Sequence, residues 1–219
     1  MGFKKLTEKH EASRILYSLK QLKELSSIHT GNSLPKPDPI IHYILMSDTL
    51  LLFSEKDDEK SFKYISGIVA ETICHGMGLS ATSIATQKTP MRFRGAISVG
   101  DFCYEVEDKI FFGPAFNDAF YWEKKQEWIG AILTPTCNEF VQKHGYDISS
   151  LIEYDAPLKN DMCRHIVKAQ KCLCIDWTAG FACKDVPPTK KFQGQNENSE
   201  FENKLDNTYK FYRYAQQIN

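Results

Sequence analysis

Apolar residues recur every three or four positions in several stretches of the chain, which is the spacing of an amphipathic α-helix. The first such stretch spans residues 8–26, and the second follows an acidic cluster at 55–59 and ends near Gly76. Negative side chains suit the first turn of a helix, because the helix dipole places partial positive charge there. Residues 201–217 predict a final helix. The apolar positions of the first two helices are Ile15, Leu16, Leu19, Leu22 and Leu25, and Phe62, Ile65, Ile68, Val69 and Ile73.

Shorter apolar runs predict β-strands. The runs at 40–45 and 49–53 flank Met46-Ser47-Asp48, and two short runs around a polar pair are typical of a β-hairpin. Gly113-Pro114 predicts the start of a helix, and Pro135 ends an apolar run. The remaining predicted strands are 92–99, which alternates between apolar and polar residues, and 102–106, 110–112, 129–134 and 172–177.

The order of these elements favours one fold class. Helices and strands are interleaved, but the strands come as hairpin pairs, which indicates an α+β protein rather than a doubly wound parallel sheet. We therefore expect an antiparallel or mixed sheet flanked by helices. The chain is short enough for a single domain over residues 1–219, with a polar, exposed loop at about 186–200.

Composition and charge narrow the function classes. The 219 residues carry a net charge of −1, which gives no reason to expect a nucleic acid or a membrane surface as partner. No apolar run approaches the roughly 18 residues that span a bilayer. Seven cysteines, an odd number without paired spacing, favour free thiols in the cytoplasm over a disulfide framework. A structural zinc site is the alternative for the group Cys163, His165, Cys172, Cys174 and Cys183, although its spacing matches no known zinc pattern.

Three segments, in order, resemble the class III nucleotide cyclase homology domain. They are MGFKKL at residues 1–6, IHYILMSDTLLLF at 41–53 and RFRGAISVGDFCYEVEDKIFFGPAFNDAFYWE at 92–123. The third segment is most similar to bacterial cyclases of the Pycsar antiphage type, which make cyclic UMP or cyclic CMP. The resemblance covers about half the chain. It implies a cyclase-like fold with a ferredoxin-like core and a head-to-tail homodimer that builds its sites across the two subunits.

The resemblance also implies a reaction and a metal site. In this family the ribose 3′ oxygen attacks the α-phosphorus of a nucleoside triphosphate and pyrophosphate leaves, with two Mg²⁺ or Mn²⁺ ions as cofactors. Asp48 matches the second metal-binding Asp, and Gly2 and Phe3 match the turn that seats the triphosphate. The first metal-binding Asp and its strand would precede Met1, so we expect them upstream of the given start or lost from a truncated copy.

Four further positions correspond to the family's nucleotide-contacting positions, and three of them carry a different residue type. Asn117 matches the residue that orients the ribose, and Tyr121 stands where the family has a transition-state Arg. A Tyr donates a hydrogen bond but carries no positive charge, and losing such a donor typically costs about 10²–10³ in rate. Ile44 and Ile110 stand where the family reads adenine or guanine, and because neither can hydrogen-bond a purine edge, UTP or CTP is the expected substrate.

Each assignment has a simpler alternative. Asp48 could be a hairpin turn residue and Asn117 a helix N-cap. Arg92 and Arg94 fit a solvated strand face better than phosphate ligands. The aromatic residues between 111 and 122 fit a core or dimer interface better than a shelf that stacks on a base. The alternatives for the whole protein are a catalytically inactive pseudo-cyclase that binds nucleotide or dimerises, and a structural α+β interaction protein.

Overall fold

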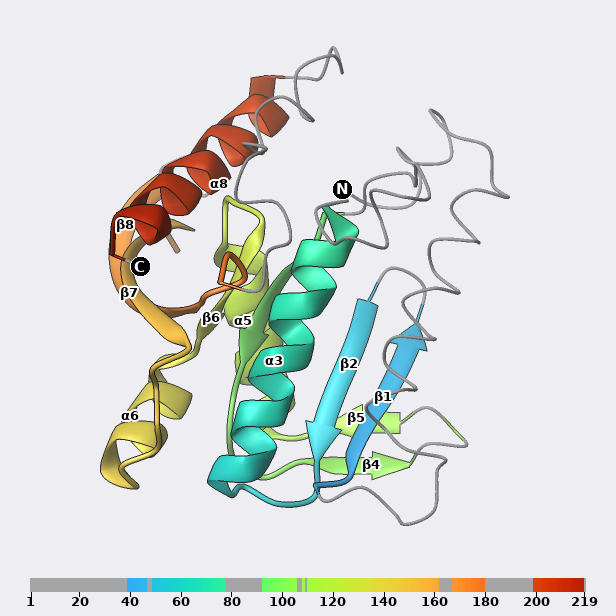
Figure 1. Ribbon diagram of the computed structural model, residues 1–219. Coiled ribbons are helices and arrows are strands. Elements are labelled where there is room, and N and C mark those ends of the chain that lie inside the picture. The colour runs from blue at the N-terminus through green and yellow to red at the C-terminus, as the bar shows by residue number, and fades with distance from the viewer. Residues whose placement is uncertain are drawn as a thin grey trace. The chain divides into compact units, whose positions relative to one another are not determined.

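The chain divides into two compact units in a computed structural model. The model describes residues 39–46, 49–77, 92–105, 108, 110–161, 167–179 and 199–218 (Figure 1). One unit comprises residues 1–92 with 181–183, and the other comprises 93–180 with 184–219. Four helices and eight strands lie in the described residues, which confirms the α+β class. The single domain over residues 1–219 stays a prediction.

The described residues of the first unit form a β-hairpin and one helix. Strands β1 (Ile41–Met46) and β2 (Thr49–Ser54) pair antiparallel, from Ile41 opposite Ser54 to Met46 opposite Thr49. Helix α3 (Glu59–Gly76) begins at Asp58, whose side chain accepts a hydrogen bond of 2.8 Å from the backbone N–H of Ser61. The apolar stripe predicted from the sequence faces inward, with Phe62, Ile68 and Ile73 buried. The hairpin and this helix agree with the sequence prediction.

The second unit is built on a four-stranded mixed sheet in the order β3-β6-β8-β7. Strand β3 (Arg94–Ile97) runs parallel to β6 (Gly130–Leu133), whereas β8 (Val167–Ile175) is antiparallel to both β6 and β7 (Leu151–Lys159). Between β3 and β6 the chain forms a short hairpin, β4 (Cys103–Glu105) with β5 (Ile110–Phe112), and helix α5 (Pro114–Lys125). All four residues of β6 are buried, so β6 is the centre of the core.

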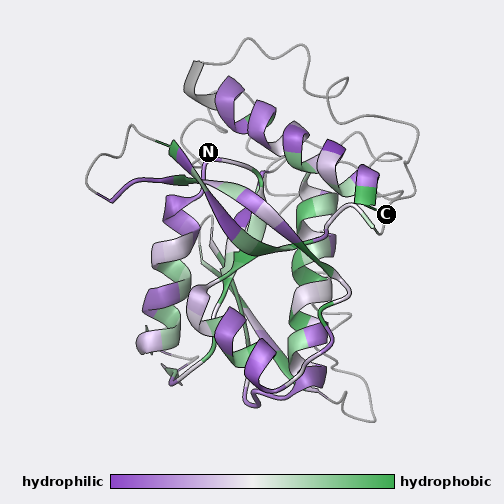
Figure 2. Cartoon of the chain, turned by 90° about the vertical axis from the view of Figure 1, so that its left-hand side faces the viewer, coloured by the Kyte–Doolittle hydropathy of each residue, from purple (hydrophilic) through white to green (hydrophobic). Residues whose placement is uncertain are grey.

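Two more helices belong to this unit. Helix α6 (Pro135–Lys143) follows β6 directly, and helix α8 (Ser199–Ile218) contacts β7. Phe211 of α8 is fully buried and meets the ring of Trp128 edge-on, at 4.7 Å between ring centroids. The side of α8 that faces away from the strands is mostly hydrophilic (Figure 2). Among the described residues, no helix is both long and apolar enough to cross a membrane.

Helix α6 and strand β7 have no counterpart in the sequence prediction. Pro135, taken as the end of a strand, is also the first residue of α6, where its missing N–H costs nothing. Pro157 interrupts the apolar pattern of β7, but a proline is tolerated because β7 is an edge strand. Strand β8 begins at Val167, five residues before the predicted start at 172. The prediction missed these residues because the first half of the strand is exposed and mostly polar, so it shows no apolar run. Ser199 and Glu200 of the predicted loop belong to α8, and residues 186–198 lie outside the described part.

Candidate functional site

Helix α5 carries both predicted catalytic residues, and its start is fixed by a glycine. Gly113 has φ of 139°, and a Cβ atom there would lie 2.5 Å from the backbone oxygen of Asp101. The same oxygen accepts a hydrogen bond of 3.3 Å from the N–H of Ala115. Pro114 then occupies the first helical turn. The close approach of two backbone segments therefore requires glycine at this position.

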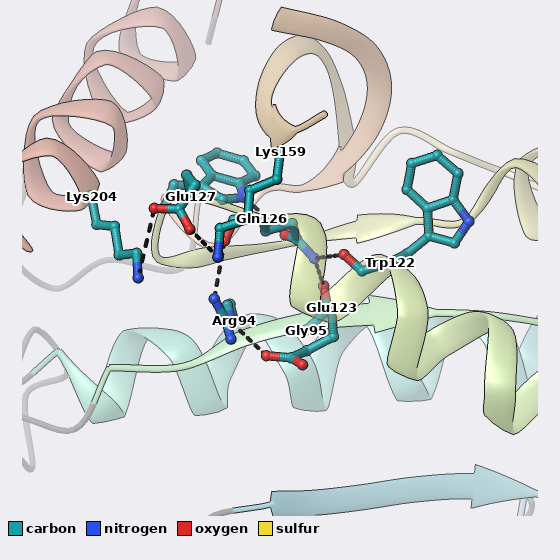
Figure 3. Close-up of polar contacts among 9 residues, drawn as sticks. Arg94, Gly95, Trp122, Glu123, Gln126, Glu127, Lys159 and Lys204 are labelled. Carbon is teal, nitrogen blue, oxygen red and sulfur yellow. Dashed lines mark hydrogen bonds and ion pairs between the residues drawn. The ribbon is translucent and has the colours of Figure 1, made fainter. Parts of the chain in front are cut away.

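One side of α5 is anchored to strand β3. The guanidinium of Arg94 forms an ion pair with Glu123 and donates a hydrogen bond of 3.1 Å to the backbone oxygen of Gln126. The hydroxyl of Ser98 donates to the Asp118 carboxylate at 2.9 Å. Arg94 is thus engaged within the protein rather than free in solvent, and a role as a phosphate ligand stays an open alternative. Figure 3 shows Arg94 and Glu123 facing each other across the strand and the helix.

Gln126 is the C-cap residue of α5, and its buried side-chain amide joins three segments. Its nitrogen donates to the backbone oxygens of Gly95 at 2.7 Å and Trp122 at 3.1 Å. Its oxygen accepts a hydrogen bond of 2.8 Å from the indole of Trp128. Figure 3 shows this amide between the strand and the end of the helix. A side chain with no exposed surface makes three hydrogen bonds, so the position of α5 on the sheet is closely defined.

A buried carboxylate follows immediately. Glu127 pairs with Lys159 of β7 at 2.6 Å and with Lys204 of α8 at 3.6 Å (Figure 3). Its backbone oxygen accepts a hydrogen bond of 2.9 Å from the Asn207 side chain. Two lysines from distant parts of the sequence compensate a charge that burial would otherwise disfavour. This cluster holds α8 and β7 to the end of α5 and is structural.

The opposite side of α5 is open to solvent. Asn117, Phe120, Tyr121 and Lys124 are all exposed and lie at helical spacing on one stripe. Asn117 does not cap the helix, because Gly113 is the N-cap residue and its backbone oxygen accepts the Asn117 N–H at 3.1 Å. The N-cap alternative for Asn117 is therefore wrong. Its amide faces outward from the first turns of α5.

Tyr121 takes part in a polar cluster with two residues that the sequence did not single out. Its hydroxyl donates a hydrogen bond of 2.6 Å to Oδ1 of Asp161, just beyond the end of β7. The ammonium of Lys125 donates to Oδ2 of Asp161 at 3.1 Å and to the Tyr121 oxygen at 3.2 Å. Lys125 lies one turn after Tyr121, but no local pattern indicates Asp161, which is 36 residues further along the chain.

Proton affinities within this cluster follow from its geometry. The hydrogen bond from Tyr121 is the largest cause that lowers the pKa of Asp161, followed by the one from Lys125. Burial acts to lower the pKa of Lys125, but its hydrogen bonds to Asp161 and Tyr121 outweigh burial, and the pKa is raised. Both shifts favour the charged forms. At neutral pH Lys125 is therefore an ammonium and Asp161 a carboxylate.

The β4–β5 hairpin joins α5 through aromatic rings. Phe102 stacks with Phe111 at 6.4 Å and with Phe116 of α5 at 6.3 Å between ring centroids. On the other face of β5, Ile110 and Phe112 are 51% and 58% exposed. The rings between 111 and 122 therefore serve partly as internal packing and partly as exposed apolar surface. Their role as a dimer interface stays a prediction.

The predicted site residues fall in different places. Ile110, Asn117 and Tyr121 belong to the second unit, whereas Ile44 belongs to the first, half-buried in β1 and opposite Leu51. Gly2, Phe3 and Asp48 lie outside the described residues. The described part holds no group of three or more His, Cys, Asp or Glu side chains that could bind a metal ion. The metal assignment to Asp48 and the Mg²⁺ or Mn²⁺ requirement stay predictions.

Four of the described cysteines, Cys103, Cys137, Cys172 and Cys174, are free thiols. Cys74, Cys137 and Cys174 are buried, and Cys103 is exposed. Burial, helped by the charge of Asp118, raises the pKa of Cys137 to about 12, and burial also raises the pKa of Cys172, to about 11. Thiols with such pKa values are poor nucleophiles at neutral pH. Of the zinc alternative, Cys163, His165 and Cys183 lie outside the described residues.

Comparisons with known proteins give no relative. No family model matches the chain, and neither a curated protein nor a solved structure matches it.

Proposed function

We propose that this chain is a class III nucleotide-cyclase-like protein that binds a nucleoside triphosphate together with Mg²⁺ or Mn²⁺ and acts as a homodimer. UTP and CTP are the proposed substrates, cyclic UMP or cyclic CMP the products, and antiphage signalling the proposed role. The proposal includes the finer fold, a cyclase-like arrangement with a ferredoxin-like core.

One observation carries the proposal: the outward stripe of α5. The two α5 residues that the resemblance assigns to the ribose and to the transition state, Asn117 and Tyr121, both lie on the exposed side of a helix whose other side is anchored to the sheet. A helix that is fixed on one side and presents an amide and a phenol on the other is suited to contact a ligand. Had these residues been buried in the core, the assignment would fail.

Exposed apolar surface supports the homodimer. Ile110 and Phe112 on β5, and Phe120 on α5, are large apolar side chains that remain exposed although neighbouring rings are packed. Apolar side chains that gather on a surface mark interaction sites. A second copy of the chain is the partner implied by the resemblance, in which each subunit completes the site of the other.

The chain's own residues define what each could contribute. The Asn117 amide can donate to and accept from a ribose hydroxyl, which would orient the attacking 3′ oxygen. The Tyr121 hydroxyl can donate one hydrogen bond to a phosphate oxygen but adds no charge there. A divalent metal ion, when bound, supplies the acidity that turns the 3′ hydroxyl into a nucleophile and neutralises the phosphates. The pseudo-cyclase alternative is favoured by Tyr121, because its hydroxyl already donates to Asp161.

The experiment measures binding and turnover separately. The purified chain is titrated with each of the four nucleoside triphosphates in Mn²⁺ by calorimetry, and cyclic products are then sought by mass spectrometry. We expect binding of UTP or CTP, weakened about tenfold or more by Asn117→Ala through loss of polar contacts worth 1.4 kcal/mol or more. Asn138→Ala is the matched control. Asn138 also has a side chain with a polar contact, because it accepts a hydrogen bond from Gln142 at 3.0 Å, but it belongs to α6 and not to the proposed site on α5.

The outcomes separate the readings. Cyclic product identifies an enzyme, and binding without product identifies a pseudo-cyclase. If no nucleoside triphosphate binds in the presence of Mn²⁺, or if Asn117→Ala and Asn138→Ala bind alike, the proposal is abandoned. The homodimer is checked by light scattering at tens of micromolar, where a monomer contradicts it.

A further inference from the structure

The Asp161 carboxylate is held by two donors in the way that a phosphate oxyanion would be. One carboxylate oxygen accepts from the Tyr121 hydroxyl at 2.6 Å and the other from the Lys125 ammonium at 3.1 Å. The two donors also contact each other at 3.2 Å. Charge-assisted hydrogen bonds of this kind bind carboxylates and phosphates alike, because both present two or more oxygens on one anionic group.

The Lys125 donor is largely shielded from solvent, whereas the acceptor is exposed. The Lys125 side chain is only 14% exposed, and its ammonium lies over the rings of Tyr121 and Trp122, at 5.0 and 4.9 Å from their centroids. Tyr121 and Lys125 both stand on α5, which Arg94 and Gln126 anchor to the sheet. The Asp161 side chain is 64% exposed and follows the last residue of β7. An exposed ion pair stabilises a protein little, so a competing anion can displace this carboxylate.

We propose that Tyr121 and Lys125 form an oxyanion-binding pair for a phosphate group of the bound nucleotide, and that Asp161 occupies this pair until the phosphate displaces it. This inference rests on the proposed function. It assigns to Lys125 the positive charge that the resembled family places at the position of Tyr121. Asp161 then acts as an internal competitor that lowers nucleotide affinity.

The neighbouring lysine provides a matched control. The ammonium of Lys124 lies 3.8 Å from the centroid of the Phe120 ring, and Lys124 is exposed. It has the same charge and nearly the same position in the sequence as Lys125, but it has no part in the contacts with Tyr121 and Asp161. A merely electrostatic effect of positive charge on α5 would involve Lys124 and Lys125 equally.

The test compares dissociation constants for UTP and for inorganic tripolyphosphate in Mn²⁺. A hydrogen bond to a charged group contributes enough that Lys125→Met should weaken both ligands about tenfold or more, with Lys124→Met within about twofold of wild type. Asp161→Asn should tighten both ligands about two- to fivefold, which is the range of an exposed ion pair. Asp206→Asn, which removes a carboxylate from an exposed pair with Lys210 at 2.7 Å, should change neither.

Further variants keep the test decisive. Lys125→Arg retains the charge and should keep most of the affinity, and thermal unfolding checks that each variant is folded. If wild type binds UTP but Lys125→Met behaves like Lys124→Met, or Asp161→Asn weakens binding, this inference is overturned while the proposed function stands. Loss of affinity for UTP but not for tripolyphosphate would also overturn it, because the contact would then be with the base or ribose. If wild type binds no nucleotide, both proposals fail.

Discussion

Replacement of Gln126 by leucine tests whether the buried amide holds α5 to the sheet. The two side chains are similar in volume, so the substitution removes hydrogen bonds without leaving a large cavity. It leaves the Trp128 indole N–H without its acceptor and the backbone oxygens of Gly95 and Trp122 without this donor. A buried donor without a partner costs about 1–3 kcal/mol, and the carbonyls, which have a second lone pair, cost less. We expect Gln126→Leu to lower the free energy of unfolding by about 3–5 kcal/mol.

Urea unfolding followed by tryptophan fluorescence measures this change, since all three tryptophans belong to the second unit. Gln142→Leu on the exposed side of α6 is the matched control and should change stability by less than about 0.5 kcal/mol. A double-mutant cycle with Trp128→Phe isolates the indole contact, and we expect a coupling energy of about 1–2 kcal/mol. A Gln126→Leu variant within about 1 kcal/mol of wild type would refute the reasoning, because the amide network would then contribute little.

Two glycines and the N-cap residue of α3 give further predictions. Gly113→Ala should destabilise the second unit by at least about 2 kcal/mol, because the new Cβ atom would combine a positive φ with a close contact to Asp101. Gly67→Ala, in the middle of α3 with open space around it, should instead stabilise the protein by about 0.5–1 kcal/mol. Thermal unfolding distinguishes the two variants. Asp58→Ala should cost about 1 kcal/mol at pH 7 through the lost cap of α3, and Asp58→Asn much less. The hydrogen bonds from Ser61 lower the pKa of Asp58 below 3.8. The stability that the Asp58 cap contributes is therefore present above pH 3.8 and is lost as the pH falls through the lowered pKa. A destabilisation by Asp58→Ala that persists undiminished at lower pH contradicts this prediction.

Elements with a regular local pattern were predictable from the sequence. The hairpin β1–β2, the helices α3, α5 and α8 and the hairpin β4–β5 all follow from apolar spacing and from acidic, glycine or proline signals at their ends. The apolar spacing along the sequence was not sufficient to predict α6 and β7. In both, a proline reads as an interruption, and only the position of the segment, directly after β6 or at the sheet edge, shows that the proline is compatible with regular structure.

The candidate site was only partly predictable for a similar reason. The spacing of Asn117 and Tyr121 places them on one side of a helix, and the sequence alone determines this. The sequence did not indicate that Arg94 would form an ion pair with Glu123. It also did not indicate that Gly113 rather than Asn117 would be the N-cap residue of α5. Each of these outcomes depends on the backbone path around the residue and on groups remote in the sequence.

The sequence by itself determined most of the local elements that the structure describes, because helix and strand periodicity and end signals act over a few neighbouring residues. Only the tertiary structure decided which polar groups meet. Asp161 reaches Tyr121 across 40 residues, and Gln126 reaches Gly95 across 31. The physical reason is that hydrogen bonds and ion pairs form wherever packing of the apolar core brings donors and acceptors together, and that packing depends on the whole chain at once.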